Sequence, residues 1–561
     1  MPRKVVITAP PPTPNGDLHV GHLAGPYIAA DVFARYVRSR GGDVAFATYS
    51  DDNQSYVETT AARLGTSPRE LCTKFAGEIA KTLELAAIQI DAFPAADEEH
   101  NEFARAFVEE LYSRGALKVK EKEFFFSPDL DAYLFEGFLS GLCPECLAET
   151  KAGICETCGH PNNYTEVLCP QSALMPDARL VRRQVKIVVL ELEPYREQIR
   201  KFFEGKWSGW RPHILRLVNE CLEKPLPDFP ITYPHSWGIP APFPETPGQV
   251  LNVWIETLTG LMKCTTDVAR KRGTATKVDE IWRRENEWEL VQFFGYDNSY
   301  FYVLPLLALS MACGDRYIFP STLLINEFYE LENHKFSTSK DHVIWARDLL
   351  QRYRSDYVRF YLALSGPAYQ KANFTEAELR KIVPAKLTEP WARMVGSLNR
   401  LMSHAGFVRG ASYRPTLVGS RHMTTLKRRF ERFYEVNTLD LKAAAENTTQ
   451  VLEAIRRRAD LLTEALDQPN RLVNPREAID LWGLLWTLAI VVGPLMPAFS
   501  SRLRAILQVP VADQWPPSNP DAWSIRPTSI AGDLLPNLDA TAASIGQDSG
   551  RLKNRVNEHF L

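Results

Sequence analysis

Hydrophobic positions follow two periods over the first 90 residues. A β-branched run at 5–7 stops at three prolines, and apolar spacing is then helical from about 18 to 40. A second strand-like run at 44–49 precedes helical spacing over 56–64 and 70–87. Strands that alternate with helices predict a parallel sheet covered by helices.

This alternation is interrupted and later resumes. Residues from about 119 to 235 carry short mixed segments, which we interpret as an insertion. Strand-like runs return near 250–254, 290–294 and 317–325, with helical spacing between them, for example over 302–312. We therefore expect one sheet built from two separated halves of the chain.

The last third of the chain is predicted to be helical. The pattern runs from about 374 to 507, interrupted early by Pro384 and Pro390, and a proline-rich stretch follows at 510–520. The stretch 481–499 has no charged residue, but Gly493, Pro494 and Pro497 break it, so we interpret it as a buried helix and expect no membrane contact.

Composition places the protein among large globular proteins. The 561 residues are 45% hydrophobic and 24% charged, with a net charge of -3, which excludes a small disulfide-stapled module and a disordered chain. Nucleic acid would have to bind local basic patches such as 427–429 or 456–458, although such runs are commonly solvated helix faces. The start of the chain lacks a signal-peptide core, so we expect a cytoplasmic protein.

Four of the nine cysteines are clustered as Cys143-x-x-Cys146 and Cys155-x-x-Cys158. A two-residue spacing directs both sulfurs of a pair to one point, so two pairs offer the four soft ligands of a tetrahedral Zn²⁺. Because no coordination position stays open, such a site would be structural. Two disulfides, or pairs without a common ligand, are the alternative.

Two motifs have the composition of phosphate-binding elements. The loop after the first strand ends in His19-Val20-Gly21-His22 at the predicted start of a helix, where free N–H groups and the helix dipole favour anions. Far downstream, residues 334–340 read HKFSTSK and combine two lysines with small hydroxyl residues. Each motif alone is also compatible with an ordinary surface segment.

Taken together and in this order, the two motifs resemble the two signatures of class I aminoacyl-tRNA synthetases. The similarity to the methionyl-tRNA synthetase branch extends over roughly 4–510 and includes further segments: 9–22, Asp51-Asp52, the four cysteines, 237–240, Val253-Trp254 and 295–297. The resemblance implies an α/β Rossmann-type catalytic domain with a zinc-knuckle connective insertion, followed by an all-α anticodon-binding-like helical bundle. The corresponding division is 1–118 (first catalytic half), 119–235 (insertion), 236–375 (second half with the KFSTSK loop), 376–525 (bundle) and 526–561 (tail).

The resemblance also implies the chemistry. A substrate carboxylate attacks the α-phosphate of ATP, which carries Mg²⁺, and the acyl adenylate then passes its acyl group to an acceptor. Thr338 stands where the family has its second lysine, and we expect Lys340 to supply that charge. The implied catalytic residues are His19, His22, Lys335 and Lys340, and the implied ATP-binding residues are Asn15, Gly21, Gly295, Asp297, Ser337 and Ser339.

The acyl pocket implied by the resemblance departs from the family pattern. Asp52 matches the carboxylate that holds the α-amino group, but Thr13 and Leu261 stand at tyrosine positions and Tyr302 at a histidine position. A polar amino acid other than methionine is therefore one hypothesis, and methionine itself is the other. The expected pocket residues are Pro11, Thr13, Asp52, Trp254, Leu258, Leu261, Phe301 and Tyr302.

The acyl acceptor remains open. Arg400 matches an arginine of the anticodon-contacting helix, but Gly396 stands at the asparagine position and Asn470 at a tryptophan position. The chain is thus either a tRNA ligase or a tRNA-independent ligase that joins the acid to a small-molecule amine. A non-enzymatic regulatory binder is a third interpretation, disfavoured by the complete set of His19, His22, Lys335 and Asp297.

Overall fold

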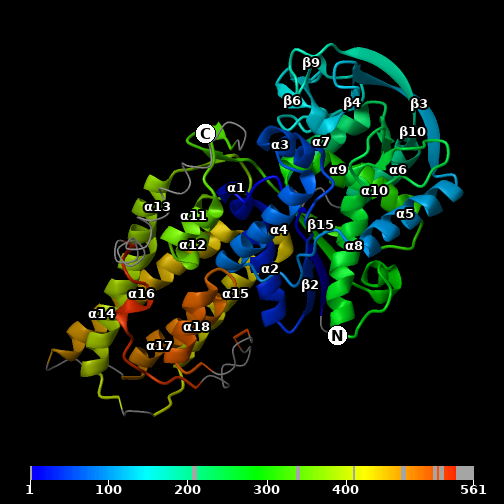
Figure 1. Cartoon of the computed structure of the whole chain (residues 1–561). Helices are drawn as coiled ribbons and strands as arrows, with labels where there is room; N and C mark the ends of the chain where they lie inside the picture. Colours follow the sequence, from blue (N-terminus) through cyan, green and yellow to red (C-terminus); the bar gives the residue numbers. More distant parts are fainter. Residues whose placement is uncertain are drawn as a thin grey trace.

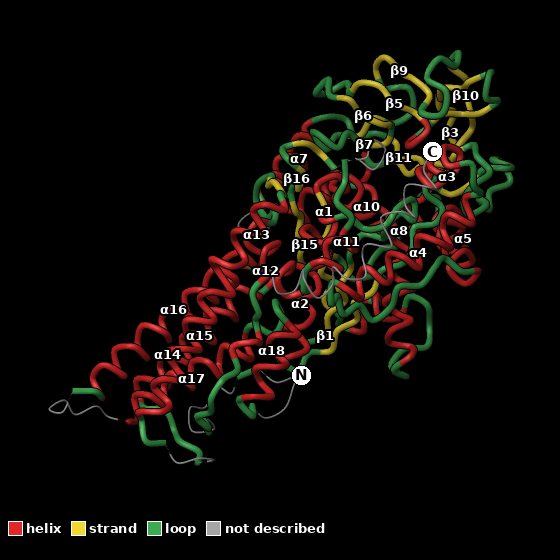
Figure 2. The backbone as a smooth tube through the Cα atoms, turned by 60° about the vertical axis from the view of Figure 1, so that its left-hand side comes forward, coloured by secondary structure: helices red, strands yellow, loops and turns green. Residues whose placement is uncertain are grey.

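The protein consists of an α/β body and a long helical region that extends from one side of it (Figures 1 and 2). The structure is a computed structural model that describes residues 3–204, 211–336, 342–407, 411–468, 475–509, 515–516 and 524–538. The α/β body contains the sheet that positions the candidate site. The helical region follows it in sequence, as the hydrophobic pattern predicts.

The body is organised around a parallel sheet with strand order β15-β14-β1-β2. Strand β1 (Lys4–Thr8) pairs in parallel with β2 (Asp43–Ala47) on one side and with β14 (Glu289–Gly295) on the other, and β15 (Pro320–Asn326) pairs with β14. The expectation of one sheet from two distant halves of the chain is confirmed. In parallel sheets, ligands bind at the carboxyl ends where neighbouring strands connect in opposite directions, which here is the boundary of β1 and β14.

The predicted helix over 18–40 is divided into three pieces. The pieces are α1 (Val20–His22), a π-helical turn (Leu23–Tyr27) and α2 (Ile28–Ser39). Pro26 lies inside the turn and has no N–H to donate, so the regular helical ladder is interrupted there.

The strand expected over 250–254 is only partly present. Strand β13 covers Val250–Leu251, and α8 (Val253–Lys271) begins directly after Asn252, whose side chain accepts a hydrogen bond from the Trp254 N–H at 3.0 Å. The N-cap residue Asn252 starts a helix within the apolar run, so the strand ends early. The apolar pattern alone does not contain this signal. The other helices of the body are α3 (Ser55–Leu64), α4 (Pro68–Leu85), α5 (Glu98–Ser113), α9 (Ser299–Val303), α10 (Pro305–Ala312), α11 (Ala346–Arg352) and α12 (Ser355–Ser365).

The chain between the two halves of the sheet forms smaller sheets at one end of the body (Figure 1). Strands β3 (Leu117–Ser127) and β10 (Val181–Glu191) pair antiparallel, and aromatic residues such as Phe124 and Phe135 fill the core beneath them. The remaining elements of this segment are β4 (Ala132–Leu134), β5 (Leu139–Leu142), β6 (Glu149–Lys151), β7 (Gly153–Ile154), β8 (Pro161–Asn162), β9 (Leu168–Ser172), α6 (Arg196–Glu204), α7 (Pro212–Glu223), β11 (Asp228–Pro230) and β12 (Thr232–Tyr233).

The helical region packs around a large apolar core. Its helices are α13 (Glu376–Val383), α14 (Glu389–His404), α15 (Leu417–Tyr434), α16 (Leu441–Leu466), α17 (Pro475–Val491) and α18 (Pro497–Ile506). Trp482 and Leu485 of α17 are fully buried, so the apolar stretch is a core helix as expected. Among the helices that the structure describes, none has the length and apolar character needed to cross a membrane.

The two regions are joined by a buried ion pair. Arg359 on α12 has no exposed surface; its guanidinium donates to the Asp31 carboxylate of α2 at 2.6 Å and to the carbonyls of Pro494 and Leu495, both at 2.8 Å. Because an isolated buried charge is costly, removing either partner is expected to be strongly destabilising.

Candidate active site

Three segments that carry predicted site residues leave the sheet at neighbouring carboxyl ends. The loop that contains Asn15 follows β1, Ser50–Asp52 follow β2, and Gly295–Asp297 end β14. Segments from both halves of the chain therefore converge where the order of the strands favours a ligand.

The first motif forms a compact turn. The His19 backbone N–H donates to Nδ1 of His22 at 3.1 Å, and the two imidazole rings stack with their centroids 3.7 Å apart. Burial lowers the pKa of His22 to about 4, so the ring is neutral at pH 7. Since Nδ1 accepts a hydrogen bond, the proton lies on Nε2, which makes His22 an N–H donor for an anion.

The described start of the second motif and the segment that follows the motif both contact this turn. The Phe336 ring stacks on His19 at 4.7 Å with nearly parallel planes, and the Val20 N–H donates to the Ile344 carbonyl at 3.1 Å. Lys335 belongs to β17 (His334–Lys335), whereas Ser337, Ser339 and Lys340 lie outside the described residues. The structure thus brings together two motifs that are about 310 residues apart in the sequence.

Sequence reasoning missed residues that fix this arrangement. The Asp17 carboxylate caps the Leu18 N–H at 2.8 Å, accepts from the Thr82 hydroxyl at 2.8 Å and pairs with Arg347 at 3.0 Å. Arg347 follows the second motif by seven residues. The ion pair is therefore a further contact between the segment after the second motif and the loop that carries the first. An acidic residue beside the turn was visible in the sequence, but its partners come from distant segments.

The segment at the end of β14 places a carboxylate beside a glycine. A Cβ added at Gly295 would lie 2.4 Å from Oδ1 of Asp297, so this close approach requires glycine. Asn298 donates to the same oxygen at 3.0 Å, and burial raises the pKa of Asp297. Gly21 is equally constrained, since a Cβ there would lie 2.9 Å from the His19 ring, and the Asn15 N–H donates to the Thr13 carbonyl at 2.9 Å.

The predicted acyl-pocket residues on α8 and α9 lie together. Trp254 stacks on Phe301 with ring centroids 3.6 Å apart, and a small cavity of about 10 Å³ is lined by Leu258, Leu261 and Tyr302 among others. Positions 254, 258 and 261 share one face of α8, as helical spacing requires.

Two carboxylates lie at the end of β2. Asp52 accepts from the Ser50 hydroxyl at 2.6 Å, and burial raises its pKa to about 6. The N–H of the neighbouring Asp51 donates to the Pro12 carbonyl at 3.1 Å, which fixes the β2 end against the loop that carries Pro11 and Thr13. The site therefore contains an acidic end, opposite in character to the imidazole turn.

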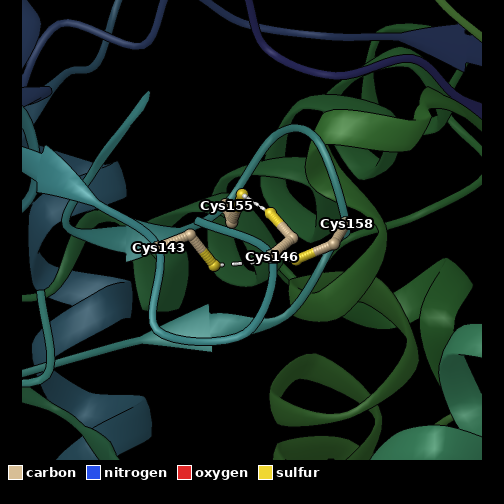
Figure 3. A group of neighbouring side chains, drawn as sticks. All are labelled: Cys143, Cys146, Cys155 and Cys158. Atoms are coloured by element: carbon tan, nitrogen blue, oxygen red, sulfur yellow. Dashed lines mark hydrogen bonds between the residues drawn. The ribbon is translucent and has the colours of Figure 1, made fainter. Parts of the chain in front are cut away.

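The four clustered cysteines converge in the insertion (Figure 3). The Cys143 and Cys158 sulfurs are 3.7 Å apart, those of Cys146 and Cys155 are 3.6 Å apart, and all four lie within 4.8 Å of one another. A tetrahedron of Zn–S bonds of about 2.3 Å has sulfurs about 3.8 Å apart, so the donor set fits zinc. All four are free thiols, which does not support the disulfide alternative.

The cysteine cluster also contacts the sheet end. The Tyr296 hydroxyl, next to Asp297, donates to the Cys158 carbonyl at 3.0 Å, and the His213 ring stacks on Tyr296 at 3.6 Å. A structural metal in this cluster would thus support the segment that carries Asp297.

Comparison with known proteins identifies the family. A family model described as tRNA synthetases class I (M) matches residues 5–402. The chain belongs to this family. The class I synthetase resemblance drawn from the motifs is therefore confirmed, as is the α/β fold followed by a helical region.

Relatives of this class I synthetase chain include methionine–tRNA ligases. That of Christiangramia forsetii is 31% identical over 379 residues, which cover 67% of this chain and 54% of the relative; that of Korarchaeum cryptofilum is 30% identical over 383 residues, or 68% of each. The chain spans about half the length of several of the curated relatives it matches. A Mycobacterium tuberculosis methionyl-tRNA synthetase structure with bound methionyl-adenylate superposes with a TM-score of 0.72 at 17% identity, covering 95% of this chain and all of that one, a likeness of fold.

The residue predicted to contact RNA, Arg400, lies in the helical region of this class I synthetase chain. Arg400 on α14 pairs with Asp460 on α16 at 3.0 Å, and its side chain is 66% exposed. The neighbouring Asn399 amide holds the backbone of Ile530 through two hydrogen bonds, at 2.9 and 3.0 Å. Asn470 lies outside the described residues. Any role of Arg400 in binding RNA remains a prediction.

Proposed function

We propose that the chain is an ATP-dependent ligase that activates an amino-acid carboxylate as an acyl adenylate and transfers the acyl group to tRNA. The stacking of Phe336 on His19 is the observation that carries this proposal, because it is a direct contact between the two segments that resemble the family signatures. In this proposal 1–118 and 236–375 form a Rossmann-type catalytic domain, 119–235 the connective insertion, 376–525 the anticodon-binding-like bundle and 526–561 a tail.

Activation proceeds by in-line attack of a carboxylate oxygen on the α-phosphorus, and the bond to the β-phosphate oxygen breaks to release pyrophosphate with its Mg²⁺. No protein side chain becomes covalent, so rate depends on position and on charge stabilisation. His19 and the Nε2–H of His22 hold phosphate oxygens, and Lys335 and Lys340 neutralise the leaving pyrophosphate. Asn15, Gly21, Gly295, Ser337 and Ser339 complete the nucleotide site.

The remaining site residues orient the two substrates. The Asp297 carboxylate accepts hydrogen bonds from the ribose hydroxyls, and the Asp52 carboxylate accepts them from the substrate α-ammonium group. The Zn²⁺ held by Cys143, Cys146, Cys155 and Cys158 is structural, because four thiolates leave no position for water.

The adenylation step is tested by ATP–pyrophosphate exchange. We expect the double variant Lys335→Ala, Lys340→Ala to lose exchange, since both cationic groups proposed for the pyrophosphate are gone. The matched control replaces two exposed lysines, Lys371→Ala and Lys381→Ala, and keeps wild-type exchange. An exchange rate in the first variant equal to the control would refute the assignment.

The acceptor is tested with the adenylating protein and total tRNA. We expect acylated tRNA that disappears after ribonuclease treatment, as the names of the relatives suggest. A small-amine acceptor is the second candidate, favoured by the pairing of Arg400 with Asp460, which engages the one arginine proposed to contact an anticodon. Amide product that forms equally after ribonuclease treatment would establish it instead.

A further inference from the structure

The acyl end of the crevice contains buried polar atoms that the fold leaves without hydrogen-bond partners. The Tyr302 hydroxyl is such an atom, in a residue only 3% exposed, and Oδ1 of Asp51 is another, also in a residue 3% exposed. No described residue supplies either atom with a partner. Because a buried, unpaired polar atom costs about 1–3 kcal/mol, such an atom in a site for a ligand points to a partner that the ligand supplies.

The two groups belong to the same part of the crevice. Tyr302 lines the small cavity together with Leu258 and Leu261, and its chain neighbour Phe301 stacks on Trp254. Asp51 is fixed at the end of β2 by its N–H bond to the Pro12 carbonyl. Their proximity also appears in their electrostatics, since the Asp51 charge contributes, after burial, to raising the pKa of the Tyr302 phenol.

The surroundings of Asp51 favour a ligand that donates. Glu256, buried nearby on α8, already accepts hydrogen bonds from the Asn53 amide at 2.9 and 3.0 Å. Burial and the charge of Glu256 raise the pKa of Asp51, so a cation or a hydrogen-bond donor placed beside Oδ1 would stabilise the charged carboxylate. A hydroxyl group placed between Asp51 and Tyr302 would donate to the carboxylate and accept from the phenol, whereas an ammonium group would donate to both.

We propose that Tyr302 and Asp51 form the polar end of the acyl pocket and select an amino acid whose side chain ends in a hydrogen-bond donor, in preference to methionine. This inference rests on the proposed adenylation activity and names its substrate class. Tyr302 is the specificity-determining residue, because its hydroxyl is left unpaired by an acid with an apolar tip. A site built around a polar group discriminates strongly against analogues that lack it.

The test is ATP–pyrophosphate exchange with the full chain and pairs of isosteric acids. Homoserine carries a hydroxyl where norvaline has a methyl group, ornithine carries an ammonium group where norleucine has a methyl group, and methionine and the other common amino acids complete the panel. We expect kcat/KM at least about tenfold higher for a donor-tipped acid than for its isostere. Homoserine and ornithine distinguish a neutral donor from a cationic one.

The variant Tyr302→Phe removes only the hydroxyl. It should lower kcat/KM for the preferred donor-tipped acid about 10- to 100-fold and change that for norleucine less than threefold. The matched control is Tyr300→Phe on the same helix, which also loses a buried hydroxyl with no described partner and should leave the preference unchanged. If Tyr302→Phe does not fold, Asp51→Asn replaces it, with the same selective loss expected and largest for ornithine.

The outcomes separate the two proposals. Exchange with no acid of the panel overturns the adenylation proposal itself. Exchange that favours methionine over the donor-tipped acids leaves adenylation intact and overturns the substrate class, and so does a donor preference that Tyr302→Phe leaves unchanged, because it removes the assigned residue.

Discussion

The two ends of the crevice differ in how complete they are without a ligand. At the phosphate end, His19, His22 and Phe336 stack on one another, and Asp17 and Arg347 fix the turn by an ion pair. At the acyl end, Tyr302 and Asp51 keep polar atoms that no described residue satisfies. In the proposed function, the first end binds the triphosphate of ATP, and the second end selects the acid.

Breaking the phosphate end should have the largest effect. We expect His22→Ala to lower ATP–pyrophosphate exchange about 100- to 1,000-fold for every acid, because one preorganised N–H donor to the phosphates is removed. The control is His404→Ala, an exposed residue at the end of α14. A loss confined to some acids would contradict the separation between the two ends.

Loss of the buried ion pair between Arg359 and Asp31 should lower the free energy of unfolding by about as much as His22→Ala raises the activation barrier. Neither end of the site is altered. Arg359→Ala leaves the buried Asp31 carboxylate with Arg35 as its remaining cation and removes the donor to the Pro494 and Leu495 carbonyls, and we expect the free energy of unfolding to fall by about 3–5 kcal/mol. Urea unfolding measures it. Arg182→Ala, which removes an exposed pair with Glu123, serves as the control and should change stability by less than about 1 kcal/mol.

A pH profile should distinguish the two ends by titration. Burial raises the pKa of Asp52 to about 6, so below that pH the carboxylate that is proposed to hold the α-ammonium group becomes protonated. We expect kcat/KM for the amino acid to fall about tenfold per pH unit below 6, while the KM for ATP stays constant. Asp52→Asn should lack this inflection.

Unfolding does not explain such a loss. A carboxyl group whose pKa is higher in the folded than in the unfolded state contributes stability at low pH, and this contribution is lost as the pH rises through 6. The contribution of Asp52 to stability therefore changes in the opposite direction to activity. Parallel loss of both between pH 7 and 5 would assign the activity change to another group.

The connection between the cysteine cluster and the crevice should have a smaller effect. Tyr296→Phe removes the hydroxyl that donates to the Cys158 carbonyl, a bond whose net contribution is about 0.5–1.5 kcal/mol. We expect a KM for ATP raised by about three- to tenfold, with bound zinc unchanged in elemental analysis. An unchanged KM for ATP would show that the cluster does not support the nucleotide wall.

The parallel sheet, the cysteine cluster and the first motif at the start of a helix could be predicted from the sequence because their signals are local. The β-branched run at 5–7, the Cys-x-x-Cys spacing and the His19–His22 turn each lie within a few consecutive residues. The division of the first helix at Pro26 was missed, because the hydrophobic period is the same on both sides of this residue. The start of α8 at Asn252 was missed as well, because an N-cap changes only one residue of the pattern.

The acyl end could be predicted only as a group of residue types. Pro11, Asp51, Leu258 and Tyr302 come from four separate segments, and the partnerless state of Asp51 and Tyr302 depends on which side chains lie around them. No spacing along the chain contains that information. The role of Asp17 was hidden for the same reason, because its partners Thr82 and Arg347 are distant in sequence.

The buried guanidinium of Arg359 has a consequence for any large ligand. The guanidinium, carried by α12, donates to Asp31 of α2 and to the Pro494 and Leu495 carbonyls in the turn between α17 and α18. The side chain has no exposed surface. Bending at this joint would break several buried hydrogen bonds at once, so we expect the helical region to move little relative to the sheet. A nucleic acid that contacts both the helical region and the sheet end would therefore have to span a nearly fixed distance, whatever its base sequence.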